Sequence, residues 1–223
     1  MIHLPALLFL ALAVPSAGDQ NLIVNGSFEE WRDLDPAILA ADWCQVDLTP
    51  PGRAPTSWMP TREQYKGMGH TASLTMDEAV KHSGARSVRI HNADMRDITY
   101  VQFSTDQFVG HPDDAHNIKP NRRYMVRWWV KGEEVATGGT GPIMMMYVSS
   151  RDGGQERRAY TYELEPTLPL GTFDWLQRRF VFITDPQAVF ATFTFQLRWT
   201  TGTIWYDDVE LLDLGPVVPV ETY

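Results

Sequence analysis

Cysteine is almost absent from this sequence, since Cys44 is the only one among 223 residues. A single thiol excludes an internal disulfide framework and a zinc site built from cysteines. Cys44 also lies too far from the start of the chain to be a lipid-attachment cysteine. We interpret it as a small buried hydrophobic residue.

Basic residues are also few, because 19 Lys and Arg stand against 28 Asp and Glu, which gives a formal net charge of −9. Nucleic acids and anionic polymers bind to basic surfaces, so this charge disfavours both classes as main partners. Neutral ligands remain open.

Long apolar runs are confined to the first 18 residues. This run ends in small residues and is too short to span a bilayer core of roughly 30 Å, so we interpret residues 1–18 as a signal peptide. The alternative is an amphipathic or disordered leader of a cytosolic protein. No later stretch suits a membrane helix, and we expect a soluble secreted protein, extracellular or periplasmic, without a membrane partner.

Helical periodicity of useful length is missing as well. The chain has instead a series of strand patterns separated by turn residues, and its 43% hydrophobic content is enough for one substantial core. The clearest strand is 124–131, and others are expected at 72–76, 85–91, 100–104, 142–149, 175–183, 190–199 and 202–212. We predict an all-β fold, an antiparallel β-sandwich or jelly roll, over residues 19–213, followed by a flexible Pro-rich tail at 214–223.

Two early stretches are less regular. Residues 21–29 are typical of a short strand, a tight Asn25-Gly26 turn and a returning strand. Prolines interrupt residues 31–70, so we expect a long loop there with one short strand near Trp43. Trp58 and Tyr65 in this loop could form a platform for a sugar or anchor the loop, and anchoring is the more frequent use.

The last strand carries two adjacent acids, Asp207 and Asp208. Apolar residues occur on both of its faces, which indicates that the strand is covered on both sides for part of its length. Carboxylates in such a place are costly unless something pairs with them. A hard divalent cation held by carboxylate and backbone oxygens is the simplest explanation.

Four stretches follow one another along the chain: NLIVNGSFE at 21–29, HSGARSV at 82–88, YMVRWWVKG at 124–132 and TIWYDDVEL at 203–211. In this order they resemble the carbohydrate-binding modules of families 4, 9 and 22, within the galactose-binding-domain-like jelly rolls. The resemblance implies a structural calcium ion (Ca2+) near the chain ends. By position its ligands would come from Asn25, Glu29, Ser83 and Asp207. The alternative is that Glu29 and Asp207 only accept hydrogen bonds from backbone amides.

The resemblance also implies that a glycan binds on an outward sheet face. There the central strands offer a set of aromatic and hydrogen-bonding residues: Arg127, Trp129, Tyr147, Gln196 and Arg198. A flat ring covers the apolar face of a sugar, while amide and guanidinium groups satisfy its hydroxyls. Alternatively, Trp129 lies under the loop at 31–70 as ordinary core.

We therefore expect a monomeric, non-catalytic module that binds a neutral polysaccharide or oligosaccharide. Two other functions remain open. A glycoside hydrolase needs two carboxylates about 5–9.5 Å apart, and Glu163 and Glu165 alternate on an expected strand. An adhesion or assembly module that contacts protein would have the same fold.

Overall fold

The computed structural model describes residues 20–40, 47–63, 72–95, 98–104, 118–152, 155–164 and 169–217. The predicted signal peptide, Trp43, Cys44, Tyr65 and Glu165 lie outside these ranges. The elements are β1 (Trp31–Asp33), α1 (Pro36–Leu39), β2 (Asp47–Thr49), β3 (Arg53–Pro55), β4 (Met59–Glu63), β5 (Ala72–Asp77), β6 (Ser87–Asn92), β7 (Ile98–Ser104), β8 (Arg122–Asp152), β9 (Gln155–Leu164), β10 (Gly171–Ile183) and β11 (Ala188–Pro216). The all-β prediction is confirmed, and every described strand pair except β2–β5 is antiparallel. No helix in the described ranges is long and apolar enough to cross a membrane.

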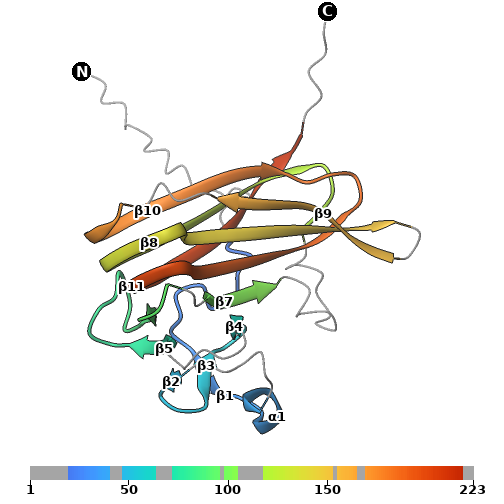
Figure 1. Ribbon diagram of the computed structural model, residues 1–223. Helices are drawn as coiled ribbons and strands as arrows, with labels where there is room; N and C mark the ends of the chain where they lie inside the picture. The colour runs from blue at the N-terminus through green and yellow to red at the C-terminus, as the bar shows by residue number, and fades with distance from the viewer. Residues whose placement is uncertain are drawn as a thin grey trace, which may run out of the picture.

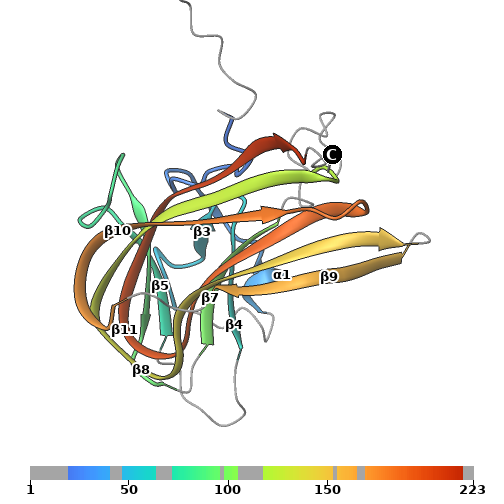
Figure 2. The same ribbon diagram turned by 90° about the horizontal axis from the view of Figure 1, so that it is seen from above.

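Two long strands, β8 and β11, form one bent antiparallel ribbon (Figures 1 and 2). The sequence analysis expected two strands in each of these regions, separated by turns. The pairing instead continues through the bend, with register shifts near Thr200 and Thr203. Trp199 and Gly202 have positive φ there, at 49° and 106°. A Cβ on Gly202 would lie 2.6 Å from the Glu134 carbonyl oxygen, so the bend requires glycine.

The bend divides the strands into two layers. The first sheet runs β10–β8–β11–β6–β5–β2 and uses residues 122–137 of β8 and 200–216 of β11. The second sheet runs β9–β8–β11–β7–β4 and uses residues 142–152 and 188–198. Phe195 of the second sheet packs on Tyr206 of the first, with ring centroids 5.0 Å apart. The ribbon is therefore folded back on itself as a sandwich.

The core between the sheets follows the predicted alternation. Tyr124, Val126, Trp128 and Val130 are buried on one face of β8, and Phe193, Phe195 and Leu197 are buried on β11. Trp128 meets Phe195 across the layers at 5.6 Å. Each such large apolar side chain contributes roughly 1.5–3 kcal/mol through burial.

The region from residue 31 onward differs from the expected loop, because β1–β4 and the single turn α1 lie within it. Trp58 at its centre is fully buried between Phe28 and Phe195, at 4.9 and 5.9 Å. It therefore anchors this segment rather than forming an exposed platform. The predicted strands at 21–29 do not form; Asn25, with φ of 52°, organises a turn by bonding Glu30 and Thr56 through its side-chain amide.

The chain end also differs slightly from the expectation. Strand β11 continues to Pro216, and the Val217 amide donates to the Asn121 carbonyl. Residues 214–217 of the expected tail are thus attached to the first sheet.

Candidate functional site

Trp129 lies on the outer face of the first sheet, because its neighbour Trp128 faces the core. It is not open to a sugar. The ring of His82 stacks on it with centroids 3.8 Å apart and planes inclined by 16°. Trp175 meets the same imidazole edge-on at 5.6 Å. Trp129 is therefore covered, as the alternative held, but the residue that covers it is His82 of the turn at 82–86, and no described residue of the loop at 31–70 is stacked on it.

Arg127 shares this outer face and is paired within the chain. Its Nε and Nη2 atoms both lie 2.5 Å from Oε2 of Glu210, the residue opposite it on β11. The guanidinium fork is thus committed to a protein carboxylate.

The turn at 82–86 is fastened to β11 by the two adjacent acids. Asp207 accepts hydrogen bonds at Oδ2 from the backbone amides of His82 (2.8 Å) and Ser83 (3.2 Å). Asp208 contacts the side chains of the same two residues, His82 Nδ1 at 2.6 Å and Ser83 Oγ at 2.7 Å. Burial is the main reason that the pKa of Asp207 is raised, to about 6.

The same turn is fastened at its other end by Glu29. Its Oε1 accepts from the amides of Ala85 (2.8 Å) and Arg86 (3.3 Å), and its carbonyl accepts from Arg86 Nη1 at 2.7 Å. Gly84 sits between these contacts with φ of 57°, and a Cβ there would lie 1.9 Å from Glu29 Oε1. The carboxylate therefore approaches the backbone closely, and only glycine permits this.

These contacts bear on the four expected calcium ligands. Oxygens of Glu29 and Asp207 accept backbone amides, whose positive ends repel a cation, and the Asn25 carbonyl accepts from Phe28 N and Trp58 Nε1. Ser83 turns its hydroxyl to Asp208. Within the described ranges no three His, Cys, Asp or Glu side chains converge as a metal site. In this arrangement Glu29 and Asp207 bind backbone amides, as in the alternative of amide-bound carboxylates, and calcium stays a prediction.

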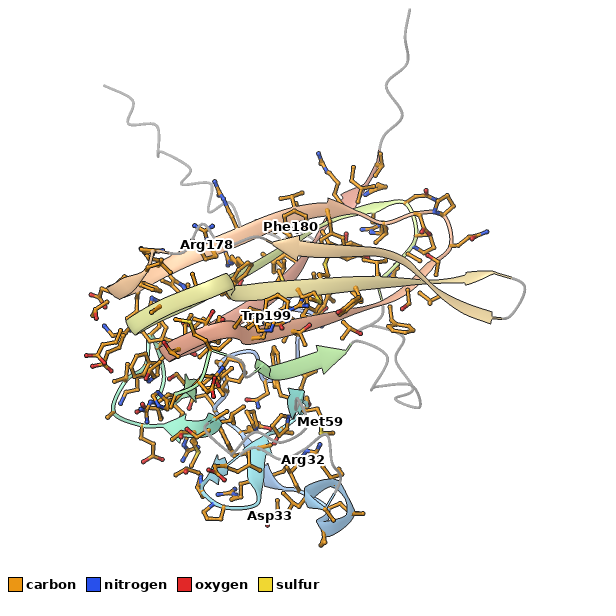
Figure 3. All side chains as sticks on the ribbon, in the orientation of Figure 1. Arg32, Asp33, Met59, Arg178, Phe180 and Trp199 are labelled. Carbon is orange, nitrogen blue, oxygen red and sulfur yellow. The ribbon has the colours of Figure 1, made fainter. Side chains whose placement is uncertain are left out.

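The other three expected ligand residues lie on the outer face of the second sheet. Tyr147 is flanked by buried Met146 and Val148, and Gln196 by buried Phe195 and Leu197, so both point away from the core. Arg198 follows on the same face, with its guanidinium carbon 4.4 Å from the Trp199 ring centroid at the bend (Figure 3).

The five expected ligand residues therefore do not form one groove. Arg127 and Trp129 lie on the outer face of the first sheet, and Tyr147, Gln196 and Arg198 lie on the outer face of the second. Within the second group accessibility differs. Gln196 is only 4% exposed, whereas Tyr147 and Arg198 are half-buried.

Sequence reasoning missed the part played by His82, Arg86 and Asp208. It used the HSGARSV stretch only as part of the resemblance, with Ser83 as an expected calcium ligand. The available signal was the local density of donors in this stretch, which faces a strand with two adjacent acids. It could not show which donor meets which acid, because 125 residues separate His82 from Asp207.

No protein-family model matches this sequence, and a search among curated proteins gives no match. Among solved structures, the chain is similar to the enzymatically active domain of tailspike protein 4 of bacteriophage CBA120, with a TM-score of 0.55 and 14% identity over 87% of this chain. The match covers only 21% of the tailspike chain, so this chain spans about a fifth of it.

Carbohydrate-binding modules are also among the similar structures. A family 4 module gives a TM-score of 0.48 and 18% identity, covering 86% of this chain and 99% of the module. The family 22 xylan-binding domain of Paenibacillus barcinonensis Xyn10C gives 0.44 and 9%, covering 72% and 88%. Modules of families 4 and 22, which the sequence resembles, are thus among the similar structures. At these identities the similarity shows the fold alone.

Proposed function

We propose that this chain is a secreted, non-catalytic carbohydrate-binding module, with its ligand on the outer face of the second sheet. The observation that carries the proposal is a row of polar side chains on β11 that turn away from the core: Thr192, Thr194, Gln196 and Arg198. Tyr147 lies opposite Thr192 in the register of β8 and β11. A sheet face with hydroxyl, amide, guanidinium and phenol groups offers what sugar recognition requires.

The accessible members of this row are the first contacts for a ligand. Tyr147 and Arg198 are half-buried, and the stacking of Arg198 on Trp199 limits the freedom of its guanidinium fork. Gln196 lies deeper. Because each hydrogen bond gives only about 0.5–1.5 kcal/mol net, several must converge on one ligand.

The net charge of −9 favours a neutral glycan over an anionic one. The leader at 1–18 supports export to a compartment where polysaccharides are met.

The test is depletion of the purified protein from solution by insoluble xylan, cellulose, β-glucan and mannan. We expect one of them to bind, with Arg198→Ala raising Kd about 10-fold or more. Arg127→Ala, on the outer face of the first sheet, is the matched control and should bind as the parent does. Failure to bind any polysaccharide removes the proposal and favours a protein-binding adhesion or assembly module. Loss of binding in the Arg127→Ala control alone would place the ligand on the outer face of the first sheet and would overturn the proposed location.

A hydrolase remains the second candidate, because the similar tailspike region belongs to an enzymatically active domain. Glu163 of β9 lies opposite Met145 in the second sheet, beside the proposed ligand face. Release of reducing sugar that is lost in Glu163→Gln would favour this reading. Binding without release, unchanged in that variant, would support the module.

A further inference from the structure

Strand β10 is an edge strand of the first sheet, because it pairs with β8 and with no other strand among the described residues. It is 13 residues long, and Figure 1 shows it running along the ribbon of β8 and β11. A long border strand presents unpaired backbone groups that can bind another strand.

This edge carries exposed apolar side chains in addition to its charged residues. Val181 and Ile183 are 49% and 51% exposed on the outer face, and Leu176 is 37% exposed on the other. Arg179 is exposed and forms no ion pair with any residue that the structure describes. Figure 3 marks Arg178 and Phe180, which precede and follow it. Exposed β-branched residues on a border strand favour association.

A bulge sets the register of the border. The pairing with β8 shifts by one residue between Phe173 and Leu176, so Asp174 and Trp175 both lie opposite Lys131. The Asp174 side chain is 86% exposed and accepts from Lys131 Nζ at 2.8 Å. Trp175 lies on the outer side, against His82.

We propose that two copies of this chain associate through β10, antiparallel, about a two-fold axis at Gln177. With the bulge counted as one position, Arg179 stands two positions from the axis on one side, and Asp174 and Trp175 stand two positions away on the other. Arg179 of each copy then meets Asp174 and Trp175 of the other. The interface gains two ion pairs and two cation–π contacts, in addition to backbone hydrogen bonds.

This arrangement has a consequence that rests on the proposed function. A two-fold axis perpendicular to the sheet keeps both second sheets on the same side. Two ligand faces could then engage one polysaccharide, which raises the apparent affinity without any new contact.

The test is the molar mass of the full chain, by light scattering and sedimentation over a range of concentrations. We expect a dimer whose Kd rises at least about 10-fold in Arg179→Glu, because two attractive pairs become repulsive. The charge exchange Asp174→Lys with Arg179→Glu should restore dimerisation to within about 3-fold of the parent. Arg123→Glu changes an exposed arginine of β8, the inner neighbour of β10, and should have no effect on dimerisation.

Other results overturn the proposal. A parent chain that stays monomeric supports the monomer expected from the sequence. A dimer insensitive to Arg179→Glu uses another surface. Failure of the double variant to recover, with its thermal unfolding unchanged, excludes this register. None of these readings depends on glycan binding, so the two proposals fail separately.

Discussion

His82 lies flat on Trp129, with ring centroids 3.8 Å apart, and its backbone amide donates to Asp207. The imidazole thus closes the outer face of the first sheet over the tryptophan. This contact makes the ring a structural element rather than an open binding platform.

Trp129→Ala should therefore act on stability. We expect the free energy of unfolding to fall by about 2–3 kcal/mol, less than for a fully buried tryptophan because the ring is half-buried. Chemical denaturation measures this, and polysaccharide depletion at low temperature should be unchanged. A variant that keeps its stability but loses binding would contradict this role.

Gly84→Ala should destabilise more than Gly171→Ala. Both glycines have positive φ, 57° and 81°, but a Cβ at Gly84 would meet Glu29 Oε1 whereas nothing lies within 4 Å at Gly171. We expect about 1 kcal/mol at Gly171 and about 2–4 kcal/mol at Gly84, measured by urea unfolding. The double variant Gly84→Ala with Glu29→Ala should recover part of the difference, and additivity of the two changes would argue against the clash.

Millimolar calcium should change the thermal midpoint by no more than about 1 °C relative to a chelator, because the acids already hold backbone amides. Magnesium serves as the control cation. A rise of several degrees specific to calcium would show that an ion displaces these amides, as the sequence resemblance implies.

Asp207 should make the fold less stable as the pH rises. Its pKa is about 6 in the folded chain against an ordinary 3.8, so the folded state binds more protons between these values. The stabilisation that protonated Asp207 gives to the folded state amounts to about 1–3 kcal/mol. It is fully present below about pH 4 and is lost between about pH 4 and 6.

Chemical unfolding at several pH values in this range measures how the free energy of unfolding depends on pH. Asp207→Asn should flatten this dependence relative to the parent. A bound calcium ion would require an ionised carboxylate, so in its presence the free energy of unfolding would rise with pH instead of falling. The same data therefore also test for the ion.

The alternation of residues 124–131 and 190–199 predicted which side chains share a face, and the structure confirms it for Trp128, Phe193 and Phe195. This succeeds because side-chain direction in a strand repeats every two residues and needs no tertiary information. The prediction of a pair of strands at 21–29 was wrong, because the Asn25 side chain supplies the hydrogen bonds that a strand would have made.

The candidate site was predicted less well. Arg127 and Gln196 each face outward as expected. They lie on the outer faces of different sheets, because the bend at Trp199 and Gly202 folds one ribbon into two layers. No local pattern encodes this fold-back.

By itself, then, the sequence determined a β-rich fold, the inward and outward side chains of stretches such as 124–131 and 190–199, and a resemblance to carbohydrate-binding modules, while export stays a prediction. Only the tertiary structure decided which outward sets meet, that His82 covers Trp129, and that Glu29 and Asp207 hold the same turn. The physical reason is that alternation is a property of neighbours in the chain. Contacts such as that between His82 and Asp207 join residues more than a hundred positions apart and exist only once the sheets have packed.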